Sequence, residues 1–418
     1  DWEQRKLGDT FEFSVSTNSL SRAQLNYEKG NIKSIHYGDI LIKYNSILEI
    51  TKDKIPFITD GSIEKYKPNL LENGDVVFAD AAEDETVGKA VEINGISDEY
   101  VVAGLHTIVA RPKEKMAKYF SGYYINADVY QRQLLRLMQG TKVSSISKGN
   151  LKKTIVAYPK NLAEQQKIGS FFKQLDNAIA LHQRKVTLLK RLKEAYLTRM
   201  LPQNSENIPL LRFADYFDPW EQRKFEDLAE SFNYGLNASA MEFDGENKYI
   251  RITDIDEYSH RFIQSGLTSP NTDLSNANDY LLKEGDILFA RTGASVGKSY
   301  QYDPLDGKVY YAGFLIRARI KPEFDSSFIF QNTLTEKYNN FIKITSQRSG
   351  QPGVNAQEYA NFSILIPSRG EQVKLGNFFK QLDDTIALHQ RQLNKYNKLK
   401  KTLLQKMFPK SGAKSSEI

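Results

Sequence analysis

The sequence contains no cysteine, which excludes disulfide bonds and thiolate metal ligands throughout its 418 residues. Only five histidines occur, and because they lack the spacing of metal ligands we expect no metal site. No apolar run approaches the roughly 20 residues of a membrane-spanning helix, and no secretory signal segment is evident. We therefore expect a cytoplasmic protein. With 26% charged and 40% apolar residues, its composition suits two to four globular domains.

The chain carries an internal repeat, and such a repeat constrains the architecture more than any single motif does. Three pairs of short segments recur in its two halves: WEQRKLGD at 2–9 and WEQRKFED at 220–227, LLENGDVVFA at 70–79 and LLKEGDILFA at 281–290, and AGLHTIVARPK at 103–113 and the looser AGFLIRARIKP at 312–322. Each half is therefore a variable segment with shared landmarks.

The strongest repeat follows each variable segment. EQQKIGSFFKQLDNAIALHQR at 164–184 returns as EQVKLGNFFKQLDDTIALHQR at 371–391, an offset of 371 − 164 = 207. The second half also has a lead-in at 208–220, of which the first half retains only Asp1 and Trp2. Because the chain opens at Asp1 rather than at methionine, we expect part of its natural N-terminus to be missing.

In each copy of this block, apolar residues recur at spacings of three and four, which predicts a long helix with a heptad seam. The seam residues are Phe172, Leu175, Ile179, Val186 and Leu189 in the first copy, and Phe379, Leu382, Ile386 and Leu393 in the second. A length of roughly 40 residues far exceeds the globular average of about 11–12. We expect the two helices to pair as an antiparallel coiled coil. Ordinary amphipathic helices packed on their own domains are the alternative.

Polar residues interrupt the seam at matching positions in the two copies. His182 corresponds to His389, and Lys193 corresponds to Lys400. Such residues cost stability but fix the register and the choice of partner helix.

The variable segments mix short strands with glycine, asparagine and aspartate turns and end in helical stretches, so we expect α+β domains. Predicted strands include DILIKY at 39–44, YIRITDI at 249–255 and DILFAR at 286–291. The predicted architecture is two tandem domains separated by two long helices, with pseudo-twofold symmetry between the repeats. Its boundaries are 1–158 for the first domain, 159–203 for the first helix, 204–367 for the second domain, and 368–418 for the second helix and tail.

The segment FARTGASVGKS at 289–299 resembles a phosphate-binding loop, but its details disagree with one. That motif needs four residues between its glycines, whereas three separate Gly293 from Gly297. No helical pattern follows to supply amide donors. The counterpart ADAAEDETVGKA at 79–90 keeps Val-Gly-Lys and adds acidic residues that would repel phosphate. We predict a tight glycine turn between strands, and nucleotide hydrolysis by this loop is kept as an alternative.

The paired FFKQLD blocks, the repeated WEQRK opening and the GDILFARTGASVGK loop resemble the specificity subunit of type I restriction–modification enzymes. The resemblance covers essentially the whole chain. It implies that each variable segment is a target recognition domain, reading one half of a bipartite, asymmetric site in double-stranded DNA. It also implies that the helices set the gap and carry two methyltransferase subunits, and that separate restriction subunits supply the motor and nuclease.

Catalysis is expected on those partner chains. The sequence lacks the Asn/Asp-Pro-Pro-Tyr/Phe motif that an adenine methyltransferase would need. By the resemblance, S-adenosylmethionine and ATP with Mg²⁺ bind to the partners, and this chain is non-catalytic and needs no cofactor of its own.

Residues that read bases should be Arg, Lys, Asn, Gln, Ser or Thr on exposed loops, because these match the donors and acceptors of base edges. The candidates lie in the glycine loop, in a second polar loop and on one strand of the second domain, and in a matching stretch of the first: Arg291, Thr292, Ser295, Arg348, Ser349, Gln351, Asn355, Arg251, Lys142, Ser144, Ser145 and Ser147. Lys33 and Lys43 are weaker candidates. For each single residue, a solvated surface position is the alternative.

The basic charge lies mainly on the helices. Residues 162–201 carry a net charge of +5 and residues 369–408 carry +6, so in a chain of +6 the remainder sums to 6 − 11 = −5. Because phosphate neutralisation drives DNA affinity, we expect this chain alone to bind DNA weakly and to need its methyltransferase partners for contacts with the DNA backbone. Local basic patches on the acidic domains are the alternative. Two further alternatives remain, a coiled-coil scaffold that does not bind DNA and a specificity chain of a related restriction architecture.

Overall fold

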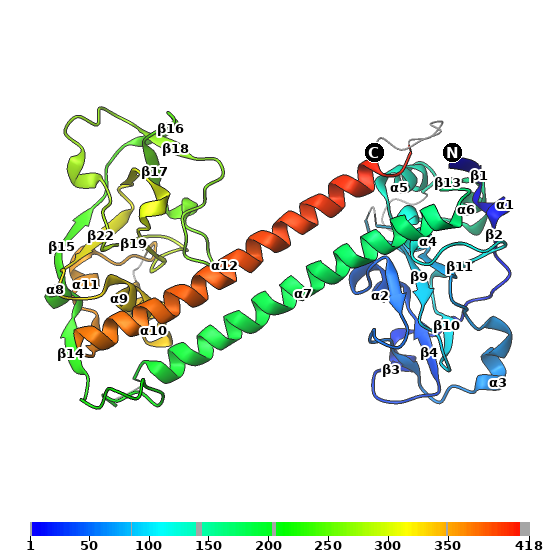
Figure 1. Ribbon diagram of the computed structural model, residues 1–418, viewed down its shortest axis with the longest axis horizontal. Coiled ribbons are helices and arrows are strands. Elements are labelled where there is room, and N and C mark those ends of the chain that lie inside the picture. Colours follow the sequence, from blue (N-terminus) through cyan, green and yellow to red (C-terminus); the bar gives the residue numbers. More distant parts are fainter. Residues whose placement is uncertain (1, 85, 139–143, 203–205, 348–349, 410–418) are drawn as a thin grey trace. The chain divides into compact units, whose positions relative to one another are not determined.

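The computed structural model describes residues 2–84, 86–138, 144–202, 206–347 and 350–409 (Figure 1). Contacts divide the chain into two compact units, Asp1–His182 with Gln392–Ile418, and Gln183–Arg391. Each unit contains one α+β domain together with part of each long helix. These helices are α7 (Leu162–Met200) and α12 (Arg369–Lys406), of 39 and 38 residues, so the two predicted long helices are confirmed. No helix within the described residues is long and apolar enough to cross a membrane.

The domain of the first unit consists of short strands and helices. Its strands are β1 (Trp2–Lys6), β2 (Phe11–Glu12), β3 (Leu25–Asn26), β4 (Ile32–Ile35), β5 (Ile47–Glu49), β6 (Phe57–Ile58), β7 (Val76–Ala79), β8 (Ala81–Ala82), β9 (Ala90–Asn94), β10 (Tyr100–Ala103), β11 (Thr107–Pro112), β12 (Ser144–Ser145) and β13 (Ile155–Pro159). Its helices are α1 (Leu7–Thr10), α2 (Tyr37–Ile42), α3 (Ile63–Tyr66), α4 (Phe120–Ile125), α5 (Asp128–Leu135) and α6 (Lys148–Lys153), with 3₁₀ turns η1 (Arg22–Gln24) and η2 (Lys67–Asn69).

The domain of the second unit has a related order of elements. Its strands are β14 (Glu221–Lys224), β15 (Ala229–Tyr234), β16 (Ser239–Glu242), β17 (Lys248–Ile250), β18 (Thr268–Asn271), β19 (Asp286–Ala290), β20 (Ser299–Gln301), β21 (Val309–Tyr311), β22 (Leu315–Ile320) and β23 (Ser363–Ile366). Its helices are α8 (Phe225–Leu228), α9 (Ser326–Asn332), α10 (Glu336–Thr345) and α11 (Ala356–Ala360), with 3₁₀ turns η3 (Ile252–Asp254), η4 (Asn278–Tyr280) and η5 (Pro304–Asp306).

The central sheets of the two domains follow one strand order. The first runs β2-β11-β7-β9-β5, and the second runs β15-β22-β19-β20. In each domain the strand that carries WEQRK pairs antiparallel with the last strand before the long helix, with Trp2 opposite Pro159 and Glu221 opposite Ile366. The repeated landmarks of the sequence therefore lie on corresponding elements of two similar scaffolds.

Not every predicted strand is a strand. The prediction for DILIKY is wrong, because these residues form α2 and the turn after it. His36 caps this helix by accepting a hydrogen bond from the Gly38 amide at 3.2 Å. Asp39 is fully buried and pairs with Arg22 at 2.6 Å and with Lys43, one turn along, at 2.9 Å. A helical turn places side chains four residues apart on the same face, within reach of each other.

The other two predicted strands are found at least in part. YIRITDI is a strand in β17 and then becomes the 3₁₀ turn η3, whereas DILFAR is confirmed as β19.

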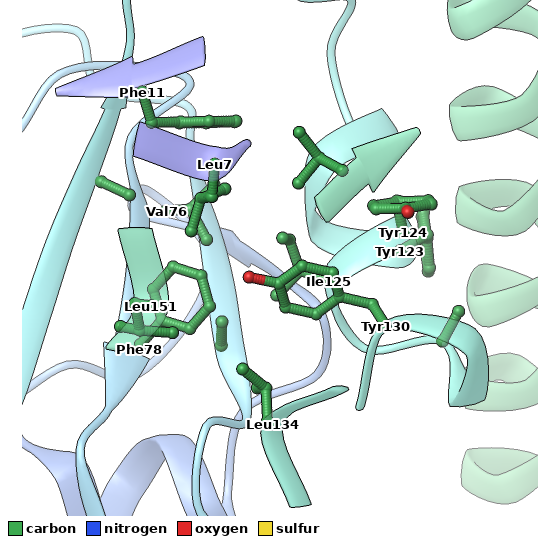
Figure 2. Packing of buried hydrophobic residues seen from close by; sticks show 14 of the residues in the cluster. Leu7, Phe11, Val76, Phe78, Tyr123, Tyr124, Ile125, Tyr130, Leu134 and Leu151 are labelled. Atoms are coloured by element: carbon green, nitrogen blue, oxygen red, sulfur yellow. The ribbon is translucent and has the colours of Figure 1, made fainter. Parts of the chain in front are cut away.

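The core of the first domain lies between the central sheet and the helices that follow it. Figure 2 shows the ring of Tyr130 among Leu7, Phe78 and Leu151. Its hydroxyl bonds with Thr154 Oγ1 at 2.7 Å, which satisfies a buried polar atom. Burial raises the pKa of Tyr130 above its ordinary value.

Two buried contacts attach each domain to the long helix that follows it. Gln165 donates to the carbonyl of Pro159 at 2.8 Å and accepts from the Ala117 amide at 3.0 Å. At the corresponding position, Gln372 donates to Pro367 at 2.9 Å and accepts from Asp325 at 3.0 Å. Since both glutamines are 2% exposed, removing either side chain would leave buried backbone groups unpaired.

Corresponding glycines let these helices approach the domains closely. A Cβ on Gly169 would lie 2.6 Å from the Lys118 carbonyl oxygen and 2.9 Å from the Phe120 amide. One on Gly376 would lie 3.0 Å from the Phe328 amide.

Within each unit, α7 and α12 run side by side in opposite directions. In the first unit Asp176 pairs with Lys400 at 2.5 Å, and His182 packs 5.4 Å from the ring of Tyr396. As the residue number rises along α7, it therefore falls along α12.

The second unit repeats this arrangement. Lys193 pairs with Asp383 at 2.6 Å, and Tyr196 packs 5.1 Å from Phe378. Burial lowers the pKa of Lys193, and the neighbouring Asp383 opposes this shift. The two ion pairs join equivalent residues of the repeat, since each partner differs from its counterpart by 207.

The predicted seam residues are at least half-buried, and two of them, Phe172 and Phe379, belong to the domain cores. Fully buried are Phe172, Leu175, Val186, Phe379, Ile386 and Leu393, and half-buried are Ile179, Leu189 and Leu382.

Each domain core also contains the C-terminal end of the helix that starts in the other repeat. Phe408, just beyond α12, packs in the first unit against Trp2, Phe120, Tyr124 and Phe172.

In the second unit, one buried cluster contains Trp220 and Phe328 together with three residues at the C-terminal end of α7: Leu197, Met200 and Leu201. Neither hydrophobic core is complete without both helices.

Opposite effects are predicted for two glycine substitutions in the first unit. Gly169→Ala introduces the close contacts described above and should destabilise the unit by roughly 1–3 kcal/mol. Gly149→Ala, on α6, meets nothing closer than Ser147 Oγ at 3.8 Å and should stabilise it by about 0.5–1 kcal/mol. Denaturant unfolding of the full chain measures both, and equal stability of the two variants would contradict the close helix–domain contact.

The Lys193–Asp383 pair should be strongly coupled. Lys193→Met leaves a largely buried carboxylate without its partner and should cost about 3 kcal/mol. The double variant Lys193→Met/Asp383→Leu should recover most of that loss. Arg223→Ala removes an exposed pair with Glu221 and should cost less than about 1 kcal/mol. Additive losses in the double variant, measured by denaturant unfolding, would rule out the coupling.

Candidate nucleic-acid interface

The glycine segment of the second domain is a turn between strands, as predicted. β19 and β20 pair antiparallel, with Phe289 opposite Ser299. Gly293 and Gly297 adopt positive φ angles of 78° and 87°, which favour glycine. Because a strand follows Lys298, no helix N-terminus is present to hold a phosphate.

The lysine of this turn has a structural role that the sequence did not indicate. Lys298 donates to the Ile255 carbonyl at 3.1 Å and pairs with Glu257 at 2.8 Å. In the first domain, the corresponding Lys89 donates to the Leu41 carbonyl at 2.9 Å. Burial lowers the pKa of Lys89, and the charge of Lys400 lowers it further. Each lysine donates to a backbone carbonyl of a neighbouring segment and so stabilises its turn. Because the ammonium group already has this partner, the contact argues against the nucleotide-binding alternative.

In the second domain the structure brings the two predicted reading loops together. Thr292 forms a bridge with Gly353, and the Gly293 amide donates to the Pro352 carbonyl at 3.0 Å. The Val354 amide donates to the Arg291 carbonyl at 2.9 Å. Segments about 60 residues apart in the chain thus form one composite surface.

The first domain joins the corresponding loops through a short ladder. Ala81 and Ala82 of β8 pair antiparallel with Ser145 and Ser144 of β12. The Ile146 amide then donates to the Asp80 carbonyl at 2.9 Å. Ser145 is exposed and Ser144 is half-buried.

Two candidate readers cap helices. Ser147 accepts a hydrogen bond from the Asn150 amide at 3.1 Å at the start of α6. Asn355 accepts one from the Glu358 amide at 2.9 Å at the start of α11. Their side-chain oxygens therefore serve the fold, although both residues lie on the surface.

Other candidates differ in exposure. Gln351 is exposed, whereas Thr292 and Ser295 are half-buried. Arg251 forms two hydrogen bonds with Asp254, at 2.8 and 2.9 Å, which hold the turn η3.

The weaker candidates Lys33 and Lys43 are engaged with the Ile50 carbonyl at 2.7 Å and with Asp39 at 2.9 Å. Lys142, Arg348 and Ser349 lie outside the described residues.

Arg291 is the candidate with the most distinctive surroundings. Its guanidinium carbon lies 5.1 Å from the ring centre of Tyr234 and 5.7 Å from that of Phe314. These two residues are 43% and 61% exposed. Within the described chain no carboxylate pairs with this arginine. Sequence reasoning missed both aromatic residues, because their approach to Arg291 depends on strand pairing between distant segments.

No metal centre is evident in the portion of the chain that the structure describes, since no three histidine, aspartate or glutamate side chains gather there.

Comparisons with known proteins agree on one family. Residues 1–191 and 218–398 match the family described as "Type I restriction modification DNA specificity domain". A putative type I restriction enzyme MjaX specificity subunit of Methanocaldococcus jannaschii is 25% identical over 202 residues, which are 48% of this chain and 45% of that protein. The MjaVIII specificity subunit of the same organism is 24% identical over 38% of this chain and 37% of its own length. The match thus spans less than half the length of these relatives.

A solved structure resembles the whole fold. The crystal structure of the type I restriction–modification system S subunit from M. genitalium has a TM-score of 0.67 and 15% sequence identity, covering 98% of this chain and 96% of that one. At this identity the likeness establishes the fold. Because the family match extends over well more than half of its residues, this chain belongs to the type I restriction–modification DNA specificity family.

Proposed function

We propose that this chain is the DNA sequence-specificity subunit of a type I restriction–modification complex, and that it recognises a bipartite, asymmetric target with a fixed gap. The observation that carries the proposal is the pairing of two loops at the same place on two matched scaffolds. In one domain the paired segments include Thr292 and Gly353, and in the other they include Ala82 and Ser144. Similar scaffolds with different loops are what two readers of different half-sites require.

The long helices supply the fixed gap in this proposal. We infer that α7 and α12 pair as an antiparallel coiled coil, with pseudo-twofold symmetry between the repeats. Support comes from the equivalent ion pairs Asp176–Lys400 and Lys193–Asp383, each lying within one unit. A helix rises 1.5 Å per residue, so a 39-residue helix measures close to 60 Å.

The chemistry belongs to partner chains in this proposal. Methyltransferase subunits bind S-adenosylmethionine and modify adenine, and restriction subunits use ATP and Mg²⁺. The present chain selects the site and is non-catalytic. Its Lys298, the residue that a nucleotide-hydrolysing loop would need, is already held by Glu257 and a backbone carbonyl.

Exposed leucines on the helices provide docking positions for two methyltransferase subunits. Leu181 on α7 and Leu388 on α12 are 53% and 48% exposed, and they are equivalent in the repeat. Leu192 and Leu399 form a second equivalent pair, at 43% and 41%. An apolar position that occurs once per repeat fits two copies of one partner.

The proposal predicts a two-part methylation pattern. When the chain is expressed with its methyltransferase subunit in a host free of adenine methylation, N6-methyladenine should appear in one motif of two specified parts separated by unspecified bases of constant number. Sequencing that detects methylated adenine measures this. Expression of either subunit alone is the control and should give no methylation.

A single continuous motif would mean that only one domain reads DNA. No methylation despite a stable complex would favour the scaffold alternative.

Leucine substitutions should change the subunit stoichiometry. Leu181→Glu should reduce the bound methyltransferase from two copies to one, and Leu181→Glu/Leu388→Glu should abolish binding, because a carboxylate would be buried without a partner. Mass measurement of the purified complex gives the count. Leu305→Glu, at a leucine that is 92% exposed in the second domain, should leave two copies bound. Retention of both copies by the double variant would place the docking surface elsewhere.

A further inference from the structure

Two residues in the different domains occupy the same backbone position. The Arg291 amide donates to the Phe314 carbonyl at 3.1 Å, and the Arg291 carbonyl accepts from Val354 at 2.9 Å. The Asp80 amide donates to His106 at 3.1 Å, and its carbonyl accepts from Ile146 at 2.9 Å. Both residues directly follow the central strand of their sheet, β19 or β7, and open the glycine loop.

The turn beyond this position also corresponds. The Gly297 amide donates to Ala290 at 2.9 Å, and the Gly88 amide donates to Ala79 at 2.8 Å. The scaffold therefore presents position 291 and position 80 in the same way, while their side chains carry opposite charges.

The residues around Arg291 hold its guanidinium in place and leave its terminal N–H groups available to a hydrogen-bond acceptor. The exposed residues Tyr234 and Phe314 flank the guanidinium, and its buried Nε has no hydrogen-bond partner among the residues that the structure describes. Aromatic faces hold an arginine in place without using its terminal N–H groups. Those groups can then reach a ligand with two adjacent acceptors. In the major groove, guanine presents such a pair in O6 and N7.

The residues around Asp80 orient its carboxylate, which is a hydrogen-bond acceptor. Its carboxylate is 28% exposed, and Oδ1 lies 3.3 Å from Nδ1 of His106, which takes the place that Phe314 has in the second domain. Tyr37 packs against His106 at 5.2 Å. A carboxylate oriented by its neighbour suits a base edge that offers an amino hydrogen.

We propose that Asp80 and Arg291 are corresponding specificity-determining residues, Arg291 reading guanine in the half-site of the second domain and Asp80 reading the amino group of cytosine or adenine in the half-site of the first. This inference rests on the proposed function and adds the base chemistry of one position in each half-site.

The test uses methylation mapping of the full chain with its methyltransferase subunit. Arg291→Gln and Arg291→Lys should each relax the preference at one G·C position of one half-site by about tenfold or more, since a bidentate contact contributes roughly 1–3 kcal/mol of discrimination. Arg291→Lys keeps the charge but loses the planar fork. Asp80→Asn should relax one position of the other half-site and leave the first unchanged.

Binding to modified DNA tests directly whether Arg291 contacts guanine. A target with 7-deazaguanine at the relaxed position lacks the N7 acceptor. It should bind the assembled wild-type complex about tenfold more weakly, with no further loss for Arg291→Gln.

Two surface substitutions serve as matched controls. Arg223→Gln, on β14, and Asp98→Asn make the same changes of charge at exposed positions outside the paired loops that contain Arg291 and Asp80. Both should preserve every base preference.

If Arg291→Gln lowers methylation evenly while Arg291→Lys behaves as wild type, Arg291 contacts phosphate, and the inference is overturned with the two-part target intact. An unchanged motif in Asp80→Asn overturns the assignment of Asp80. Absence of a two-part target in the wild type would instead refute the proposed function.

Discussion

The hydrophobic core of each domain depends on the end of a helix that begins in the other repeat. Phe408 fills the first core beside Trp2 and Phe120, and Leu201 fills the second beside Trp220. Burying such a side chain contributes roughly 1.5–3 kcal/mol, so neither domain reaches full stability without both helices. The ion pairs within the helix contacts favour one register, because a shift along the helices would separate buried charges. The paired loops of each domain are therefore attached to a core that includes both helices.

Sequence reasoning predicted the repeat, the two long helices and the glycine turn, because each depends on local patterning or on a landmark that occurs twice. It predicted a strand at residues 39–44, where the structure has a helix. The burial of Asp39 against Arg22 depends on a tertiary contact, which the spacing of apolar residues does not reveal. The structure pairs the predicted loops in each domain, whereas several single candidate residues have structural roles. Ser147 and Asn355 cap helices, and Arg251 is held by Asp254. Those roles depend on particular hydrogen bonds, and residue type alone does not predict which hydrogen bonds form.

In both domains, repeated side chains stabilise the scaffold, whereas the residues proposed to recognise DNA differ. Repeated side chains such as Gln165, Gln372 and the turn lysines bind backbone carbonyls and hold the elements in place. The first residue after the central strand differs between the domains, where Asp80 and Arg291 share their backbone hydrogen bonds but differ in charge. A loop held by backbone contacts tolerates such exchange, because the substituted side chain carries little of the fold's stability.

In the proposed function, each domain reads one half-site independently, from an equivalent position. The most direct test is a chain in which residues 2–159 replace residues 220–367, an exchange bounded by corresponding landmarks at the strand pairs β1–β13 and β14–β23. Expressed with the methyltransferase subunit, this chain should methylate a symmetric target in which the first half-site occurs twice as an inverted repeat with the original gap. Methylation of the unchanged asymmetric target would contradict the account, because the second domain would then contribute no base readout.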